Sequence, residues 1–331
     1  MYEDKTNMIS IETLQSEIEA QLANIKWNKP PKGLYTPIEY SIALGGKRIR
    51  PVMCLASCML FTDNYQKAIP AALAIEIFHN FTLLHDDVMD KADIRRNSPT
   101  VWKKWNSNTA ILSGDAMLIE AYKLLAQTDS PAFSMILNTF NQTAVEVCEG
   151  QQYDMEFETR DDVSIEEYME MIRLKTAVLL AGAVKIGALI GGASDTDTEA
   201  LYNFAIKLGL AFQLQDDLLD TYGDEKTFGK AIGGDIMENK KTFLLISAME
   251  NAQPDQLNAI QAWINEENPV REEKVEAIRN IYDEIGVKYM AEEKINELFA
   301  QALQIVREMN ISAEGKLFFT EFANKLLKRN K

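Results

Sequence analysis

Hydrophobic residues recur along most of the chain at intervals of three or four, the periodicity of amphipathic α-helices. One such stripe is formed by Leu201, Phe204, Ala205, Leu208 and Phe212. Strand signals are weak, because β-branched residues do not cluster and no Asn-Gly turn occurs. The pattern predicts an all-α protein with helices near 9–23, 36–45, 51–62, 67–90, 107–127, 131–152, 164–192, 197–221, 240–251, 254–267, 270–285 and 288–328, the last broken near Asn310.

Two segments show where the helices are buried. The segment Ala71 to Asp90 is apolar nearly all round, as expected of a helix inside a bundle. The apolar run Ala177 to Ala193 contains Lys185 and is shorter than the roughly 20 residues that a membrane span needs. We therefore expect core helices and no stable membrane insertion.

Composition excludes several classes of protein. The 331 residues include 34 Lys and Arg against 50 Asp and Glu, a net charge of −16. Such a charge argues against binding to nucleic acid and to anionic lipid. Three cysteines give no disulfide framework, and the segment from Met1 to Lys5 has no apolar signal region. These features favour a cytoplasmic protein. No fixed-period repeat occurs, and we expect a single domain over residues 1–331.

Two acidic clusters follow apolar helical stretches with the same spacing: Asp86, Asp87 and Asp90, then Asp216, Asp217 and Asp220. In each cluster the first and last carboxylates lie one turn apart on a common helix face. Two carboxylates on one face suit Mg²⁺, which also keeps waters and bridges to phosphates. One such cluster alone could be a solvated helix end. Two copies favour facing carboxylates across a cavity, if the helices lie side by side.

Basic residues lie near these clusters although the chain as a whole is acidic. Lys47, Arg48 and Arg50 follow a glycine pair, and Arg95 and Arg96 follow the first cluster. Arginine and lysine side chains bind phosphate oxygens. The pattern suggests two polyanion sites, one that uses metal and one that does not. Of the two histidines, His79 could donate a hydrogen bond to a phosphate, whereas we expect His85 to pack in the core.

The motifs resemble those of trans-polyprenyl diphosphate synthases, the family that makes farnesyl, geranylgeranyl and longer prenyl diphosphates. The matching segments are GGKRIRP at 45–51, DDVMDKADIRR at 86–96, LKT at 174–176 and FQLQDDLLDTYGDEKTFGK at 212–230. Terpene cyclases resemble this fold, but they lack GGKRIRP and the arginine pair. The resemblance implies a single large helical bundle of the isoprenoid synthase type with a central active-site cavity. It also implies a homodimer.

The resemblance implies roles for the residues at matching positions. Mg²⁺, in three ions per site, would be bound by Asp86, Asp90 and Asp216, with Asp87 and Asp220 acting by hydrogen bonding or through water. The allylic diphosphate would contact Arg95, Lys175, Thr176, Gln213, Lys230 and Lys240. Isopentenyl diphosphate would contact Lys47, Arg50, His79 and Arg96. One departure is Asn239, where the family commonly has glycine before its lysine, and it makes Lys240 the less secure assignment.

The implied reaction is a Mg²⁺-dependent prenyl transfer. An allylic diphosphate of C5 to C15 loses diphosphate when the growing negative charge is neutralised, which three Mg²⁺ ions with Arg95, Lys175 and Lys230 would do. The Thr176 hydroxyl and the Gln213 amide oxygen would face the carbocation. Isopentenyl diphosphate then attacks, and its proton is lost to the departed diphosphate. The loop from Tyr222 to Lys230 would cover the site.

Product length should depend on the residues that precede the first acidic cluster. The growing chain would run beside the Ala71–Asp90 helix, where Phe81 and Phe78 could form a floor and Thr82 is small. This combination suggests a C20 product, with C15 next. The alternative is a deeper floor and a long-chain product of C30 or more. A different kind of alternative is a non-catalytic partner subunit of a prenyl synthase, but such subunits typically lose an aspartate motif.

Overall fold

The computed structural model describes residues 8–223 and 232–327 and confirms the all-α fold. Its residues divide into two compact units. One unit comprises Met1–Ala144, Leu179–Tyr202 and Met309–Phe318, and the other comprises Val145–Val178, Asn203–Glu308 and Phe319–Lys331. The single domain expected over residues 1–331 stays a prediction.

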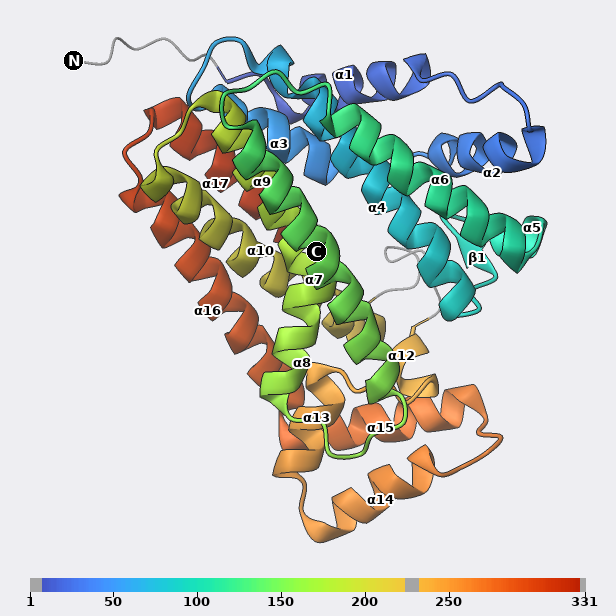
Figure 1. Ribbon diagram of the computed structural model, residues 1–331. Helices are drawn as coiled ribbons and strands as arrows, with labels where there is room; N and C mark the ends of the chain where they lie inside the picture. The colour runs from blue at the N-terminus through green and yellow to red at the C-terminus, as the bar shows by residue number, and fades with distance from the viewer. Residues whose placement is uncertain (1–7, 224–231, 328–331) are drawn as a thin grey trace. The chain divides into compact units, whose positions relative to one another are not determined.

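The first unit is built around α4 (Ile69–Met89), which packs most extensively against α6 (Ser107–Leu125) and also against α3 (Ile49–Met59). Figure 1 shows α4 and α6 side by side. This unit also contains α1 (Ile11–Asn24), α2 (Lys32–Ala43), η1 (Tyr65–Ala68), α5 (Val101–Lys104) and most of α9 (Val178–Gly191). Three further helices begin in this unit: α7 (Phe133–Phe157), α10 (Asp195–Tyr222) and α17 (Ala313–Leu327).

Small residues let helices of this unit approach closely. A Cβ atom at Gly187 of α9 would lie only 2.0 Å from the carbonyl oxygen of Cys54 in α3. A side chain at this position would therefore separate two helices of the core. Cys54 and Cys58 are both buried, as expected for small apolar residues of an interior helix.

A short hairpin follows α4 and carries the arginine pair. Strands β1 (Ile94–Arg95) and β2 (Ser98–Pro99) are antiparallel, and Arg96 and Asn97 between them have φ values of 52° and 58°. Two consecutive residues with positive φ are typical of the tight turns that join hairpin strands. Each strand has only two residues, which is too short to produce a recognisable strand pattern in the sequence.

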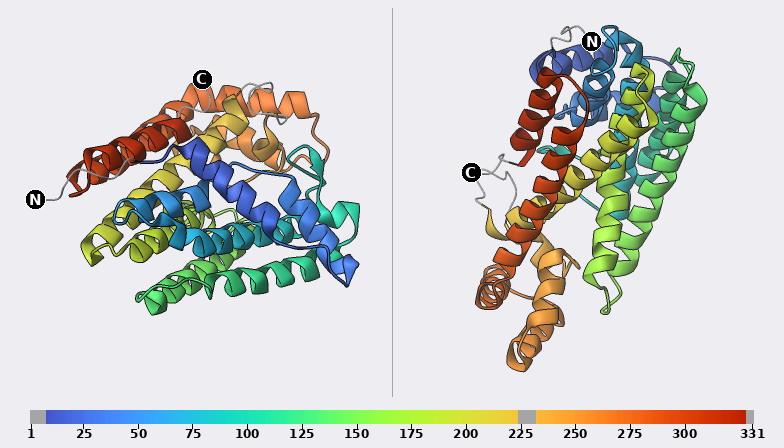
Figure 2. Two further views of the ribbon diagram at one scale, coloured as in Figure 1. Left: turned by 90° about the horizontal axis from the view of Figure 1, so that it is seen from above. Right: turned by 90° about the vertical axis from the view of Figure 1, so that its left-hand side faces the viewer.

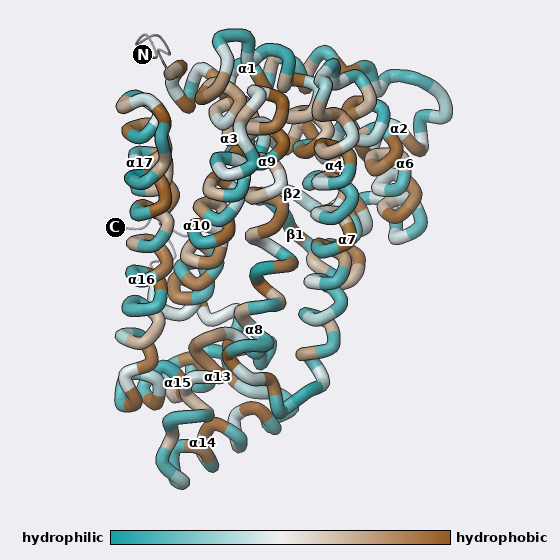
Figure 3. The backbone as a smooth tube through the Cα atoms, turned by 60° about the vertical axis from the view of Figure 1, so that its left-hand side comes forward, coloured by the Kyte–Doolittle hydropathy of each residue, from teal (hydrophilic) through white to brown (hydrophobic). Residues whose placement is uncertain are grey.

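The second unit contains the second half of α7, α8 (Ile165–Ile172), the π-helical turn η2 (Arg173–Ala177), most of α10, α12 (Gly234–Met237), α13 (Phe243–Asn251), α14 (Pro254–Ile264), α15 (Arg271–Ile285) and α16 (Val287–Glu308). Helices α13, α14 and α15 remain together in both views of Figure 2. Figure 3 shows polar and apolar bands alternating along α16. Its buried residues recur at intervals of three or four: Val287, Ala291, Ile295, Leu298, Ala302 and Val306.

The observed helices follow the expected ones with two informative differences. Helix α2 begins at Lys32, four residues before the expected start, so that Pro37 lies inside the helix instead of in its first turn. The expected helix over 164–192 starts with the capping box of Ser164 and Glu167, but η2 interrupts it. The expected break near Asn310 is confirmed, because α16 ends at Glu308 and α17 begins at Ala313.

Two helical stretches are long and apolar enough to cross a membrane by length and composition alone, Tyr65–Met89 and Ile165–Gly191. In both, most of the apolar window is buried inside the protein, which is also typical of a core helix.

Candidate active site

The first acidic cluster lies at the carboxyl end of α4. Asp86 is half-buried and Asp90 is exposed, one helical turn apart on one face. Asp87 points elsewhere: it is 3% exposed, and its Oδ1 accepts a hydrogen bond of 2.8 Å from Arg95 Nε. Burial raises the pKa of Asp87, although the attraction of Arg95 opposes this shift. Arg95 therefore compensates the buried charge of Asp87.

The carboxylates suit a metal that binds together with a substrate. Among the described residues there is no group of three His, Cys, Asp or Glu side chains that could hold a metal ion by themselves. Mg²⁺ is commonly bound by one or two carboxylates, with waters and phosphate oxygens completing its octahedral shell. Asp86 and Asp90, and separately Asp216 and Asp220, offer donors of this kind.

The glycine pair before α3 makes room for the second arginine of the hairpin. The Nη1 group of Arg96 donates a hydrogen bond to the carbonyl oxygen of Gly45. A Cβ atom at Gly46 would lie 2.9 Å from Arg96 Nη2, and Gly46 has a φ of 151°, which L-residues rarely adopt. Glycine at this position thus allows the loop and the Arg96 guanidinium to lie against each other.

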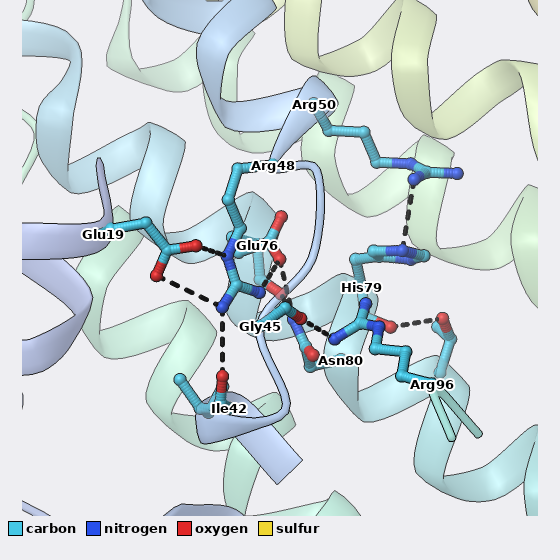
Figure 4. Close-up of polar contacts among 10 residues, drawn as sticks. Glu19, Ile42, Gly45, Arg48, Arg50, Glu76, His79, Asn80 and Arg96 are labelled. Atoms are coloured by element: carbon cyan, nitrogen blue, oxygen red, sulfur yellow. Dashed lines mark hydrogen bonds and ion pairs between the residues drawn. The ribbon is translucent and has the colours of Figure 1, made fainter. Parts of the chain in front are cut away.

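Arg50 and His79 are in direct contact (Figure 4), with 3.1 Å between Arg50 Nη1 and His79 Nε2. A guanidinium can only donate, so Nε2 accepts and the ring proton is on Nδ1. Burial lowers the pKa of His79 well below 6.5, and Arg50 and Arg96 lower it further. Neutral His79 can thus offer Nδ1–H to an anion. The Nε–H of Arg50 is buried and has no hydrogen-bond partner within the part of the chain that the structure describes.

The structure therefore brings together three of the four residues expected to bind isopentenyl diphosphate, Arg50, His79 and Arg96. The fourth, Lys47, is exposed in the adjoining loop. Two arginines and one histidine that lie close together can bind an anion. None of the three is bonded to a carboxylate in the part of the chain that the structure describes.

The second acidic cluster lies near the end of α10 in the other unit. Asp216 is exposed and Asp220 is half-buried, while Asp217 is 6% exposed. Asp217 accepts hydrogen bonds from the Tyr168 hydroxyl and, at 3.0 Å, from Gln213 Nε2. Asp220 Oδ2 accepts from the backbone N–H of Asp235 at 2.9 Å. Burial, and then the charge of Asp220, raises the pKa of Asp235 to about 7.

The LKT motif forms the π-helical turn η2, a feature often found at functional sites. Lys175 forms an ion pair with Asp154 of α7. Thr176 Oγ1 donates to Gln213 Oε1 at 3.1 Å, so Thr176 and Gln213 are in contact as the resemblance implies. Gly150 permits this packing, because a Cβ atom there would lie 2.3 Å from the backbone nitrogen of Lys175.

Sequence reasoning missed the supporting residues Asp154, Tyr168 and Asp235. None of them belongs to a motif quoted above, and each lies far along the chain from the residue it contacts. For Asp154, the glycine four residues earlier was an available sign of close backbone approach.

Of the two expected lysines, Lys230 lies outside the described residues, as does most of the loop from Tyr222 to Lys230. Lys240 is half-exposed and lies 3.9 Å from Asp235 and 3.5 Å from Glu238. Asn239 has a φ of 53°, the left-handed conformation that asparagine tolerates better than most residues. The departure from glycine at 239 thus leaves a backbone conformation that glycine would also adopt.

The residues expected to set product length lie on α4. Phe78 and Phe81 have ring centroids 5.4 Å apart, and Phe78 also packs at 5.4 Å on Phe140 of α7, a neighbour that sequence reasoning did not identify. Phe81 packs at 4.7 Å on the ring of His85, whose Nε2 also lies 3.0 Å from the carbonyl oxygen of Ile111. Thr82 Oγ1 donates to the carbonyl of His79 at 2.8 Å. The four rings of Phe140, Phe78, Phe81 and His85 form a continuous series of tilted and edge-to-face contacts, the aromatic cluster.

Comparison with known proteins identifies the family. The model of the polyprenyl synthetase family matches residues 31–285. The chain belongs to the polyprenyl synthetase family. Family membership makes it a trans-prenyltransferase with the all-α isoprenoid synthase fold.

Relatives match this prenyltransferase over nearly their whole length. It is 36% identical to the geranylgeranyl pyrophosphate synthase of Geoglobus acetivorans, over 95% of this chain and 96% of that protein. It superposes on a crystal structure of a geranylgeranyl pyrophosphate synthase with a TM-score of 0.92 and 44% identity, covering 98% of this chain and 100% of the other. The geranylgeranyl pyrophosphate synthase of Corynebacterium glutamicum, solved with isoprenyl diphosphate and magnesium, has a TM-score of 0.86 and 26% identity, covering 97% of this chain and 100% of that one.

Proposed function

We propose that this prenyltransferase condenses isopentenyl diphosphate with an allylic diphosphate of C5 to C15 and releases a short-chain all-trans product, with C20 the first expectation for its length and C15 the second. The observation that carries the proposal is the full-length likeness to geranylgeranyl diphosphate synthases in a chain that keeps both aspartate clusters. A non-catalytic partner subunit is disfavoured because neither cluster is degraded.

The first unit supplies the isopentenyl diphosphate pocket. Arg50 and Arg96 contribute fixed positive charge, neutral His79 contributes its Nδ1–H, and Lys47 adds a cation from the exposed loop. Within residues 8–223 and 232–327, no carboxylate forms a hydrogen bond or ion pair with these donors, so the diphosphate binds there directly instead of through metal. The arrangement supports a substrate that keeps its diphosphate throughout the reaction.

Metal and the allylic diphosphate are assigned by donor chemistry. In the unit that holds α4, Asp86 and Asp90 bind two Mg²⁺ ions, Asp87 supports them through Arg95, and Arg95 contacts the allylic diphosphate. For the unit that holds α10, the resemblance assigns Asp216, with help from Asp220, to a third ion, and it assigns Lys175, Lys230 and Lys240 to the allylic diphosphate. When bound, Mg²⁺ neutralises the charge that develops on the leaving group.

The contacts of Thr176 indicate how the chain can stabilise the allylic cation. Its hydroxyl proton is directed at Gln213 Oε1, so the hydroxyl lone pairs are available to a positive centre. Asp217 holds the Gln213 amide nitrogen, which fixes the amide oxygen on the Thr176 side. Carbon–carbon bond formation then places the charge on the isopentenyl unit, and loss of a proton to the departed diphosphate restores a double bond.

Product length is set by Phe81 and Phe78, the two phenylalanines that α4 contributes to the aromatic cluster. Phe81 lies five residues before Asp86 and is 9% exposed, and Phe78, eight residues before Asp86, is 1% exposed. A chain that grows beside α4 would end against Phe81. Thr82 leaves room for one more isoprene unit than an aromatic residue would, which supports C20 over C15.

The protein is further proposed to be a cytoplasmic homodimer. Exposed apolar side chains gather on α6 and at the start of α7 in the first unit, at Ile111, Leu112, Ile119, Tyr122 and Met135. Such a patch on two adjacent elements is typical of a protein interface.

The direct test is incorporation of labelled isopentenyl diphosphate with C5, C10 or C15 allylic starters in Mg²⁺ or in EDTA. We expect incorporation that EDTA abolishes and that Asp86→Asn and Asp216→Asn each reduce by roughly a hundredfold or more, because transition-state charge then loses stabilisation. Equal counts with Mg²⁺ and EDTA, at the level of a blank without protein, would favour the partner-subunit alternative.

A further inference from the structure

A third arginine lies in the same loop as the anion-binding residues but makes different contacts. Arg48 stands between Lys47 and Arg50, and its side chain is 3% exposed. Its Nε donates to Glu19 Oε1 at 2.8 Å, its Nη1 to Glu76 Oε1 at 2.7 Å, and its Nη2 to the carbonyl of Ile42 at 3.0 Å (Figure 4). Arg48 thus donates from all three of its guanidinium nitrogens to groups of the protein.

The partners of Arg48 come from three other helices. Glu19 belongs to α1, Ile42 to α2, and Glu76 to α4, three residues before His79. Glu76 is 2% exposed, and its Oε1, which accepts from Arg48, also accepts from Asn80 Nδ2 at 2.9 Å. A buried carboxylate needs such partners to remain charged. Burial acts to lower the pKa of Arg48, but hydrogen bonding to Glu19 and the charge of Glu76 raise it on balance.

The backbone at Arg48 explains why this pairing matters for its neighbours. Arg48 has a φ of 49°, a left-handed conformation that is strained for a residue with a side chain, and it precedes the first residue of α3. Strained conformations persist where surrounding contacts determine them, and they cluster at ligand-binding sites. The side-chain contacts of Arg48 therefore fix the turn that joins Lys47 to the helix carrying Arg50.

We propose that Arg48, Glu76 and Glu19 are positioning residues for the isopentenyl diphosphate pocket, and that α1 is a functional part of this pocket. Glu19 precedes the residues that the family model matches, which begin at residue 31. The inference rests on the proposed function, because it presupposes that Lys47, Arg50, His79 and Arg96 bind isopentenyl diphosphate.

The sign of the effect separates positioning from simple electrostatics. Replacing Glu19 or Glu76 by glutamine removes a negative charge beside an anion pocket. If these acids acted only through their charge, the variants would bind isopentenyl diphosphate more tightly. If they position Arg48, the variants lose the fixed turn and bind it more weakly. If they served stability alone, the melting temperature would fall and KM would not change.

The test compares Glu19→Gln, Glu76→Gln and Arg48→Lys with the wild-type enzyme. Each is assayed for KM of isopentenyl diphosphate at saturating allylic substrate, for KM of the allylic substrate, and for binding of isopentenyl diphosphate alone in EDTA by titration calorimetry. We expect KM and Kd for isopentenyl diphosphate to rise roughly tenfold in Glu19→Gln and up to about a hundredfold in Glu76→Gln, the range seen when supporting contacts are removed. The KM of the allylic substrate should stay within about twofold.

Arg48→Lys should also raise the KM of isopentenyl diphosphate above the wild-type value, because lysine cannot bond two carboxylates and a carbonyl in one plane. The matched control is Glu17→Gln, also on α1, whose carboxylate accepts from the Tyr65 hydroxyl instead of an arginine. It should leave both KM values unchanged.

Two results would overturn the inference. One is a KM for isopentenyl diphosphate in Glu19→Gln that equals or falls below the wild-type value while the wild-type enzyme is active. The other is an equal rise in both KM values. Glu19→Gln decides the matter even if Glu76→Gln does not fold, because the Glu19 side chain is 42% exposed. Failure of the proposed function itself would appear separately, as a wild-type protein that incorporates no label.

Discussion

At the scale of single residues, the anion pocket depends on a histidine that stays neutral. The folded protein lowers the pKa of His79 well below the ordinary value of 6.5, through burial first and then through nearby arginines. Below about pH 6.5 the unfolded chain therefore binds a proton at this residue that the folded protein does not. The free energy of unfolding must decrease as the pH falls through this range.

This linkage predicts a pH-dependent difference between the wild type and His79→Gln. The contribution of His79 is constant above about pH 7 and is lost as the pH falls, with a slope of at most about 1.4 kcal/mol per pH unit. Glutamine does not titrate, so the variant should gain stability relative to the wild type between about pH 6.5 and pH 5. Urea denaturation at a series of pH values measures this, and parallel stability curves would contradict it.

Gly46 offers a second test at this scale. Because its Cβ position lies 2.9 Å from Arg96 Nη2, alanine would displace the guanidinium or the loop. We expect Gly46→Ala to raise KM for isopentenyl diphosphate roughly tenfold or more, since small displacements of binding groups are costly. Gly33→Ala is the control, because nothing lies within 4 Å of that Cβ position. A Gly46→Ala enzyme with the KM of the control would show that the loop contact is unimportant.

At the scale of elements, η2 shows what the sequence could and could not predict. Periodicity correctly indicated helix over 164–192, and the Ser164 capping box marked its start. Apolar spacing could not reveal the π-helical turn, because the run from Ala177 to Ala193 that follows it is apolar on nearly every face and hides the rotation that an inserted residue causes. The turn is recognisable only with the contact between Gly150 and Lys175, which joins segments distant in the chain.

The contact between Gly150 and η2 predicts an allylic-specific defect. In Gly150→Ala the added methyl group would press on the backbone of Lys175, whose side chain is expected to bind the allylic diphosphate. We expect kcat/KM for the allylic substrate to fall about tenfold or more while KM for isopentenyl diphosphate stays the same. Steady-state kinetics with each substrate varied in turn measures this. Equal losses for both substrates would point to general misfolding.

The motif residues and their supports differ in the same way. Aspartate pairs, the arginine pair and GGKRIRP could be recognised from spacing, and the structure brings Arg50, His79 and Arg96 together as expected. Asp154, Tyr168 and Glu76 could not be recognised, because a buried acid or tyrosine acquires its role from a partner that folding supplies. Sequence identifies groups that act on substrate more readily than groups that hold them.

The aromatic cluster predicts how substitutions of its phenylalanines on α4 change product length. Phe81→Ala removes the first ring of the expected floor and should lengthen the product by at least one isoprene unit. Phe78→Ala removes a ring that Phe81 covers, so on its own it should change the product less. Chromatography of dephosphorylated products measures both, and an unchanged distribution in Phe81→Ala would contradict the role of this residue.

At the scale of the whole molecule, the exposed apolar residues on α6 predict a dimer. Light scattering should give a mass twice the 37.4 kDa of the chain. Ile119→Asp places a charge in the centre of the patch and should shift the mass toward that of the monomer. Leu317→Asp, at an exposed position of α17, is the control and should leave the dimer intact. A dimer that withstands Ile119→Asp would locate the interface elsewhere.

The central claim is that the protein makes a short-chain prenyl diphosphate, and product length from the wild-type enzyme tests it most directly. Labelled isopentenyl diphosphate, Mg²⁺ and the C5 allylic starter are incubated with purified protein, and the dephosphorylated products are separated by chain length. We expect a series that ends at C20, and a series that ends at C15 as the second possibility. A series that continues to C30 or beyond would contradict the floor at Phe81, and no product longer than the starter would contradict the enzyme itself.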